Sequence, residues 1–129
     1  MPLMDTIENI LREYSEALYK IIDSEDVVAI FDTDLNYMAA NNAACELLQK
    51  KKYELEGKNI LELFPSLTAS KSHRQMLHAL SGEVVIDVIT EGTFTREGAK
   101  YISSYYPLKK KEIVYAILAI TKKLYFPNV

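Results

Sequence analysis

The first 22 residues place apolar side chains at the spacing of a helix. Apolar positions recur every three or four residues, and charged residues fill the positions between them. The pattern predicts an amphipathic helix within residues 1–25. Its apolar stripe is wider than packing on one domain needs, so we expect part of it to contact a second copy of the chain, with packing on its own domain alone as the alternative. The residues expected at this dimer contact are Ile7, Ile10, Leu11, Tyr14, Leu18 and Ile21.

The next part of the chain consists of short apolar runs separated by turn residues. Residues 27–31 are rich in valine and isoleucine and predict a strand. Residues 32–36 have the composition of a turn, and a second short strand is expected at 37–40. Capping residues then predict three helices. The first spans 43–50, begins after Asn41 and Asn42, and is closed by the lysines at 50–52. The second spans 60–64 and begins after Asn59. The third spans 66–81 and ends before Gly82, and its residues expected to face inward are Leu67, Met76, Leu77 and Leu80.

The period of the pattern changes after Gly82. Residues 83–95, 99–108 and 112–122 are rich in Val, Ile, Thr and Tyr, which favour strands. Turn residues and a lysine run separate the three segments, so we expect an antiparallel meander. The whole order predicts an α+β domain with one five-stranded antiparallel sheet, short helices over one face and the N-terminal amphipathic helix outside it.

Composition places the chain among ordinary globular domains. Its 129 residues are 49% hydrophobic and 26% charged, and the single cysteine, Cys45, excludes a disulfide framework within the chain. No run of about 18 apolar residues is present, and the N-terminus lacks the basic segment of a secretory signal. These features predict a cytoplasmic protein that does not enter a membrane.

The charges are unevenly distributed along the chain. Residues 1–66 carry 13 acidic and 6 basic residues, a net charge of −7, and residues 67–129 carry 5 and 9, a net charge of +4. The overall charge of −3 argues against direct nucleic-acid binding. Opposite patches that steer a partner or a second copy are one interpretation, and solvated faces whose signs happen to cluster are the other.

Six short motifs occur in one order and at one spacing. They are Ile-Phe-Asp-Thr-Asp-Leu-Asn at 30–36, Asn-Asn-Ala-Ala with Leu-Leu at 41–48, Glu-Leu-Glu-Gly-Lys at 54–58, Leu-Glu-Leu-Phe-Pro at 61–65, Ser-Gly-Glu at 81–83 and Tyr-Pro-Leu at 106–108. With them the chain resembles the PAS sensory domain family. The resemblance implies a PAS-like sensor domain over 26–122, preceded by the helix at 1–25 and followed by a C-terminal tail at 123–129.

Two departures from the family pattern carry predictions. Leu35 replaces the glycine of the first hairpin, which leaves Asn36 as the expected left-handed residue. The family's closing Asp-Ile-Thr, which often couples the sheet to a following helix, reads Ala119-Ile120-Thr121 here, and Pro127 discourages a helix after it. The domain is therefore expected to be poorly suited to passing a signal through its C-terminus.

The cofactors that the resemblance brings into question find little support in the sequence. Cys45 precedes the Gly-Lys turn at 57–58, whereas the flavin-reactive cysteine of light-sensing relatives follows it. His73 and His78 are five residues apart and cannot share one metal on a helix, although either alone has the chemistry of an axial haem ligand. We therefore expect neither flavin nor haem.

Residue patterns of an enzyme are also missing. The sequence contains no phosphate-binding glycine loop, no dinucleotide-binding glycine motif and no paired zinc-binding histidines. Ser70, Ser72 and His73 supply a nucleophile and a base, but they crowd one helix turn without an orienting acid. We therefore expect no catalytic activity.

The resemblance implies a small cavity between the concave face of the sheet and the helices. Strand alternation projects tyrosines and a serine into it from the fourth strand, and Ile113, Tyr115 and Ile117 from the fifth. The hydroxyls could orient the polar end of an otherwise apolar ligand, or they could bond to backbone and water in a filled core. The candidate pocket residues are Phe64, Met76, Leu80, Tyr101, Ser103, Tyr105 and Tyr115.

The functional prediction follows from the resemblance and the expected pocket. We expect a sensory module that binds an unidentified small molecule or associates with itself, and that modulates a partner or a linked transmitter such as a histidine kinase. The alternative is a pure interaction module with a filled core. A haem- or flavin-based sensor is the third interpretation.

Overall fold

A computed structural model describes residues 25–91 and 99–125 of the chain. The predicted helix at 1–25, with all six residues of its expected dimer contact, lies outside the described residues except for residue 25. The end of the expected tail, 126–129, is outside them as well.

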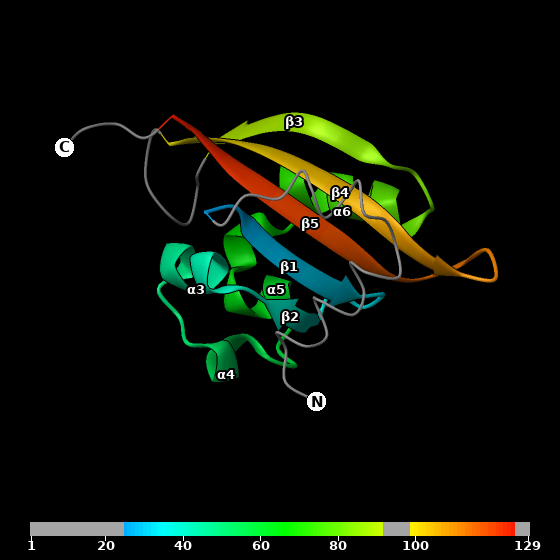
Figure 1. Cartoon of the computed structure of the whole chain (residues 1–129), viewed down its shortest axis with the longest axis horizontal. Helices are drawn as coiled ribbons and strands as arrows, with labels where there is room; N and C mark the ends of the chain where they lie inside the picture. The colour runs from blue at the N-terminus through cyan, green and yellow to red at the C-terminus, as the bar shows by residue number, and fades with distance from the viewer. Residues whose placement is uncertain (1–24, 92–98, 126–129) are drawn as a thin grey trace.

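A five-stranded antiparallel sheet forms the centre of the molecule, as the sequence predicted (Figure 1). Its strands lie in the order β2-β1-β5-β4-β3, so the first and the last strand along the chain are neighbours in the middle of the sheet. The strands are β1 (Val27–Asp32), β2 (Tyr37–Ala40), β3 (Val85–Glu91), β4 (Lys100–Lys110) and β5 (Ile113–Tyr125). The last strand therefore continues three residues into the segment that was expected to be a tail.

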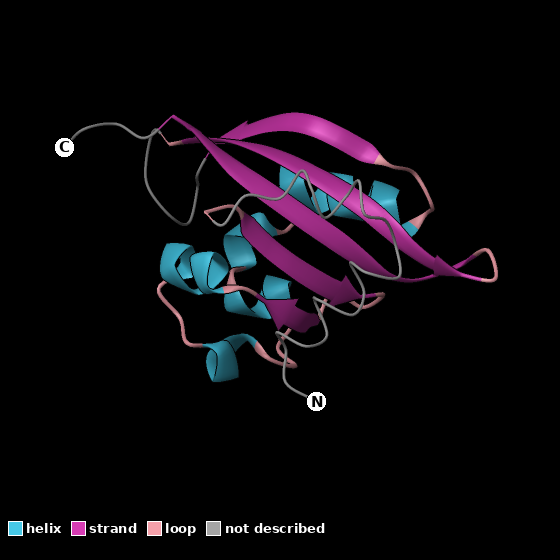
Figure 2. Cartoon of the chain, in the orientation of Figure 1, coloured by secondary structure: helices cyan, strands magenta, loops and turns pink. Residues whose placement is uncertain are grey.

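The helices of the described chain share one side of the sheet (Figure 2). They are α3 (Asn42–Leu48), α4 (Lys52–Leu55), α5 (Ile60–Leu63), the 3-10 helix η1 (Pro65–Leu67) and α6 (Lys71–Leu80). Apolar residues of these helices pack against β1, β2 and β5 in an inner core. A second apolar cluster, which includes Val28, Ile30 and Leu118, lies on the opposite face of the sheet.

Two predicted helix limits were wrong because left-handed residues interrupt the chain. Ala69, with φ of 62°, prevents a helix from running through 66–81, and α6 begins after Ser70, whose hydroxyl accepts a hydrogen bond from the His73 N–H at 3.1 Å. Gln49, with φ of 55°, ends α3 before the lysine run that was expected to close it. Lys52 instead begins α4.

Asn41 joins α3 to the first strand. Its side-chain oxygen accepts hydrogen bonds from the backbone N–H of Ala44 at 2.9 Å and of Val28 at 3.1 Å. Its amide nitrogen donates to the carbonyl of Asp26 at 2.8 Å. The N-cap predicted at Asn41 is confirmed, and Asn42 is the first residue of the helix.

The turn between β1 and β2 differs from the prediction. The left-handed residue is Leu35, with φ of 66°, and Asn36 has no positive φ. Leu35 is only 4% exposed, so its side chain packs in the inner core. Asn36 uses its side chain instead, donating to the Asp32 carboxylate at 3.1 Å and accepting from the Asn59 amide at 3.2 Å. Burial of leucine and fixation of asparagine together hold the strained backbone at Leu35.

Candidate ligand cavity

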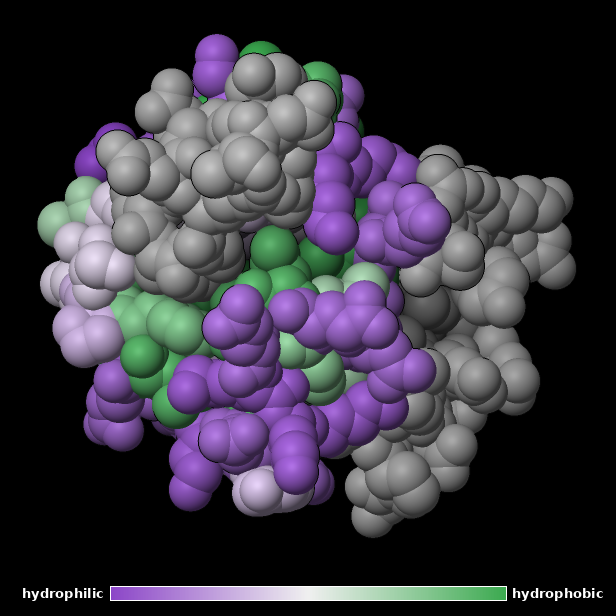
Figure 3. All heavy atoms as spheres, turned by 90° about the vertical axis from the view of Figure 1, so that its left-hand side faces the viewer, coloured by the Kyte–Doolittle hydropathy of each residue, from purple (hydrophilic) through white to green (hydrophobic). Residues whose placement is uncertain are grey.

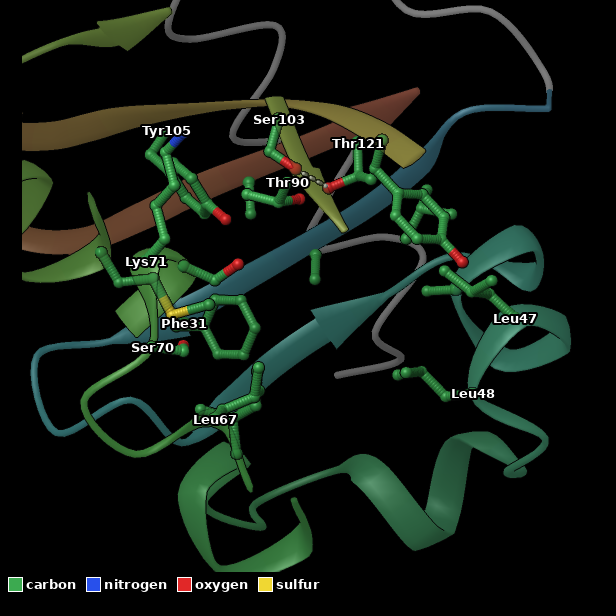
Figure 4. Close-up of a pocket in the computed structure, with 18 of the residues that line it drawn as sticks. Phe31, Leu47, Leu48, Leu67, Ser70, Lys71, Thr90, Ser103, Tyr105 and Thr121 are labelled. Carbon is green, nitrogen blue, oxygen red and sulfur yellow. Dashed lines mark hydrogen bonds between the residues drawn. The ribbon is translucent and has the colours of Figure 1, made fainter. Parts of the chain in front are cut away.

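A cavity of about 500 Å3 lies between the inner face of the sheet and the helices. Figure 4 shows its walls: β1, β4 and β5 on one side, and α3, η1 and the start of α6 on the other. A volume of this size is typical of small-molecule sites in proteins. In Figure 3 hydrophobic residues are visible between hydrophilic ones near the middle of the face, so apolar surface reaches the solvent there.

Small side chains at the centre of the sheet leave this space open. Ala29 on β1 pairs with Ala119 on β5, and Ala119 pairs with Tyr105 on β4. Both alanines line the cavity. Because directly paired residues of antiparallel strands point to the same face, two neighbouring methyl groups stand where larger side chains would fill the core. The apolar wall is completed mainly by Phe31, Leu47, Leu48, Leu67 and Met76.

Hydroxyl groups make up most of the polar lining. Ser103 on β4 faces Thr121 on β5, and their hydroxyl oxygens are 3.0 Å apart. Tyr105 lies two residues further along β4 on the same face and is 3% exposed. Burial raises the pKa of Tyr105, and the neighbouring hydroxyls of Ser103 and Ser72 act in the opposite direction. Four hydroxyls from α6, β4 and β5, those of Ser72, Tyr105, Ser103 and Thr121, therefore line the cavity, and the Ser103–Thr121 pair is hydrogen-bonded.

A further tyrosine borders the cavity from β2. Tyr37 is 4% exposed and its ring lies 4.5 Å from that of Phe31, centre to centre. Burial raises the pKa of Tyr37 well above its ordinary value, with smaller contributions from Cys45 and Tyr105. Both phenols are therefore neutral at physiological pH, and each keeps its O–H as a hydrogen-bond donor.

Four of the seven predicted pocket residues line the cavity: Met76, Tyr101, Ser103 and Tyr105. Phe64 and Leu80 are half-buried against the inner core but are not part of the lining. The alternation along β4 placed its three residues correctly, since Tyr101, Ser103 and Tyr105 are all buried on the inner face.

Tyr115 was placed wrongly. It is 38% exposed and does not line the cavity, and Ile113, expected on the same face, is 70% exposed. The strand β1 pairs with β5 only as far as Ala116, so residues 113–115 lie in the part of the β4–β5 hairpin that extends past the core. Leu77, also expected to face inward, is 49% exposed on α6.

Sequence reasoning missed several residues of the lining. Thr121 could have been found, because it follows Ile117 and Ala119 at the strand period on β5. Lys71 and Lys100 carry no periodic signal and were not considered. The Lys71 ammonium reaches across from α6 to β3 and donates to the carbonyl of Ile89 at 2.9 Å.

The residues considered for cofactors and catalysis lie elsewhere. Neither histidine of α6 lines the cavity: the Nδ1 atom of His73 accepts a hydrogen bond from the Ala69 N–H, and that of His78 lies 3.1 Å from a carboxylate oxygen of Glu83. Cys45 is half-buried and is not part of the lining, and burial raises the pKa of its thiol. Within residues 25–91 and 99–125, no three acidic, histidine or cysteine side chains are grouped so as to hold a metal ion. In the same ranges no helix has the length and apolarity needed to cross a membrane.

Comparison with solved structures identifies many similar folds. A sensory box sensor histidine kinase from Vibrio cholerae aligns with a TM-score of 0.68 at 17% identity, covering 92% of this chain and 98% of that one. A LOV protein from Rhodobacter sphaeroides aligns with a TM-score of 0.63 at 12% identity, covering 94% and 68%. VqmA bound to DPO, a protein also solved from Vibrio cholerae, aligns with a TM-score of 0.62 at 16% identity, covering 84% of this chain and 57% of that one.

These low identities carry the fold alone. No curated protein sequence matches the chain significantly. The family model of the PAS fold, however, matches residues 23–122, most of the chain. This range agrees with the extent of the resemblance in the sequence and with the five-stranded sheet. The chain belongs to the PAS-fold family.

Proposed function

We propose that this domain is a sensory module that binds a small, mostly apolar molecule in the cavity. The observation that carries the proposal is the open space beside the central pair Ala29 and Ala119, lined by hydroxyls on one wall and apolar side chains on the other. A module that only docks partners needs no such space, and a filled core would be more stable. One protein of similar fold is described as VqmA bound to DPO, which supports the proposal by analogy.

The bound molecule would act by changing the packing around the cavity. Helix α6 contributes both Ser72 and Met76 to the lining, and it contacts β3, β4 and β5. A guest that displaces Met76 therefore moves or stiffens α6, and methionine repacks at low cost. We propose that a partner or a linked transmitter such as a histidine kinase reads this change, while the domain itself performs no chemistry.

Mass spectrometry of the purified protein under native conditions tests the proposal. We expect a retained small molecule, and we expect that addition of this molecule at one hundred times its dissociation constant stabilises the fold by about 2.7 kcal/mol. Ser103→Leu should abolish the stabilisation by filling the cavity. Ser66→Leu, the same substitution at an exposed residue outside the lining, should leave it intact. Absence of any retained or stabilising molecule would favour the interaction-module alternative.

We further propose that the amphipathic stripe at 1–25 joins two copies of the chain. The apolar residues at helical spacing support this proposal. Sedimentation should show a dimer at micromolar concentration, and charges placed at both Ile7 and Tyr14 should give a folded monomer. A wild-type chain that stays monomeric at high concentration would contradict it.

A further inference from the structure

The charged groups of the cavity lining are all basic. Two lysines, Lys71 and Lys100, line the cavity, and within the described part of the chain no aspartate or glutamate does. This holds although the whole chain has a net charge of −3. Both lysines are exposed, so they attract an anion through partly solvated surroundings, where their two like charges act together. The charge of the cavity lining is therefore opposite in sign to the net charge of the chain.

The hydroxyl groups of the lining add hydrogen-bond donors. Ser72, Tyr105, Ser103 and Thr121 each carry one O–H, and the hydrogen bond between Ser103 and Thr121 uses one of these four protons. The ammonium of Lys71 likewise has three N–H donors, of which one reaches the Ile89 carbonyl. A ligand that presents only acceptors fits both groups.

The arrangement of the walls separates the two ends of a guest. In Figure 4 the Ser103–Thr121 pair lies at the top of the view, while Leu47 and Leu48 of α3 and Leu67 of η1 lie to the side of and below the open space. Ser70, Lys71 and Ser72 come from the start of α6, whose helix dipole adds positive potential beside it. The polar and positive groups therefore lie mainly along β4, β5 and the start of α6, and the apolar side chains mainly along α3 and η1.

We propose that the cavity binds a small organic anion with an apolar body, of the class of aromatic or short branched-chain monocarboxylates. The proposal rests on the proposed function and specifies its ligand class. The carboxylate accepts hydrogen bonds from the hydroxyls of the lining and from Lys71, and its charge is balanced by both lysines. The apolar body contacts Phe31, Leu67 and Met76.

Matched pairs of acids and neutral amides test the ligand class. The probes are 3-phenylpropanoate with 3-phenylpropanamide and 4-methylpentanoate with 4-methylpentanamide, titrated calorimetrically onto the full chain. We expect at least one acid to bind about tenfold more tightly than its amide, the effect of one charge-assisted hydrogen bond. A higher salt concentration should weaken binding of the acid and leave binding of the amide unchanged.

Lysine variants locate the effect. Lys71→Met should weaken acid binding about tenfold and leave amide binding unchanged, whereas Lys110→Met, at an exposed position near the β4–β5 turn, should change neither. Lys100→Met provides a second, independent position. Retention of the acid's affinity in both cavity variants would overturn the proposal.

Two further outcomes separate this proposal from the proposed function. Amides that bind as tightly as their acids, or a neutral molecule retained in native mass spectrometry, would overturn the anion class and leave small-molecule sensing standing. Binding of neither member of any pair, with no retained molecule, would overturn both.

Discussion

The left-handed backbone at Leu35 predicts that a glycine variant is more stable than an alanine variant at this position. Leu35 has φ of 66° and is 4% exposed, so it combines a strained backbone with a buried side chain. Truncation to alanine removes the buried side chain, which costs about 3 kcal/mol in a core. A residue with a Cβ atom in the left-handed region costs about 1 kcal/mol relative to glycine. Leu35→Ala should therefore destabilise by about 3 kcal/mol and Leu35→Gly by only about 2 kcal/mol.

Urea unfolding of the two variants measures the difference, provided that both keep the slope of the wild-type transition. Leu55 supplies the control, because it is fully buried at the end of α4 and has no positive φ. There the order should reverse, with Leu55→Gly about 1 kcal/mol less stable than Leu55→Ala. A glycine variant at residue 35 that is less stable than the alanine variant would refute the claim that strain is stored at this turn.

Three other substitutions test separate parts of the structure by equilibrium unfolding. Asn41→Ala removes an N-cap and two further hydrogen bonds, so it should cost about 2–4 kcal/mol, while Asn41→Asp, which keeps the accepting oxygen, should cost less. Lys111 and Glu112 both have positive φ in the β4–β5 turn, so the double change to Asn-Gly should stabilise by about 1 kcal/mol, and no gain would contradict this turn type. Burial raises the pKa of Tyr37 above the ordinary value of 10.0, so its contribution to stability is complete below about pH 10 and is lost as pH rises further. Tyr37→Phe should reduce the loss of unfolding free energy with rising pH. An unchanged pH dependence would contradict the burial of the phenol.

The order of elements could be predicted because it depends on local patterns. Apolar runs with β-branched residues, and asparagine and serine at helix starts, are signals within a few residues of one another. The caps at Asn41 and Asn59 were both identified in this way. The prediction of turns and helix limits was wrong where a residue other than glycine is left-handed, at Leu35, Gln49 and Ala69. Packing and tertiary hydrogen bonds hold such residues, and these contacts leave no local trace.

The cavity was predictable where it follows strand alternation and not where it depends on distant partners. Tyr101, Ser103 and Tyr105 face inward because side chains of β4 alternate. Tyr115 is exposed because the pairing of β1 with β5 ends at Ala116, and the sequence of β5 alone does not show where that pairing ends. Lys71 enters the lining because α6 starts five residues later than predicted, at the level of Ile89 on β3.

The size and the polarity of the cavity have one origin in the sequence. Large apolar residues occupy the opposite face of β1 and β5, at Val28, Ile30 and Leu118, and these are at most 2% exposed. The inner face of the same strands carries the smaller Ala29, Ala119 and Thr121 beside the larger Phe31 and Ile117. An empty apolar space of this volume would destabilise a small domain severely, whereas a space bordered by hydroxyls can hold water until a ligand replaces it. The small side chains that leave the space open are thus neighbours of the hydroxyls that supply hydrogen bonds. This arrangement suits a ligand that can be exchanged and not a permanently filled core.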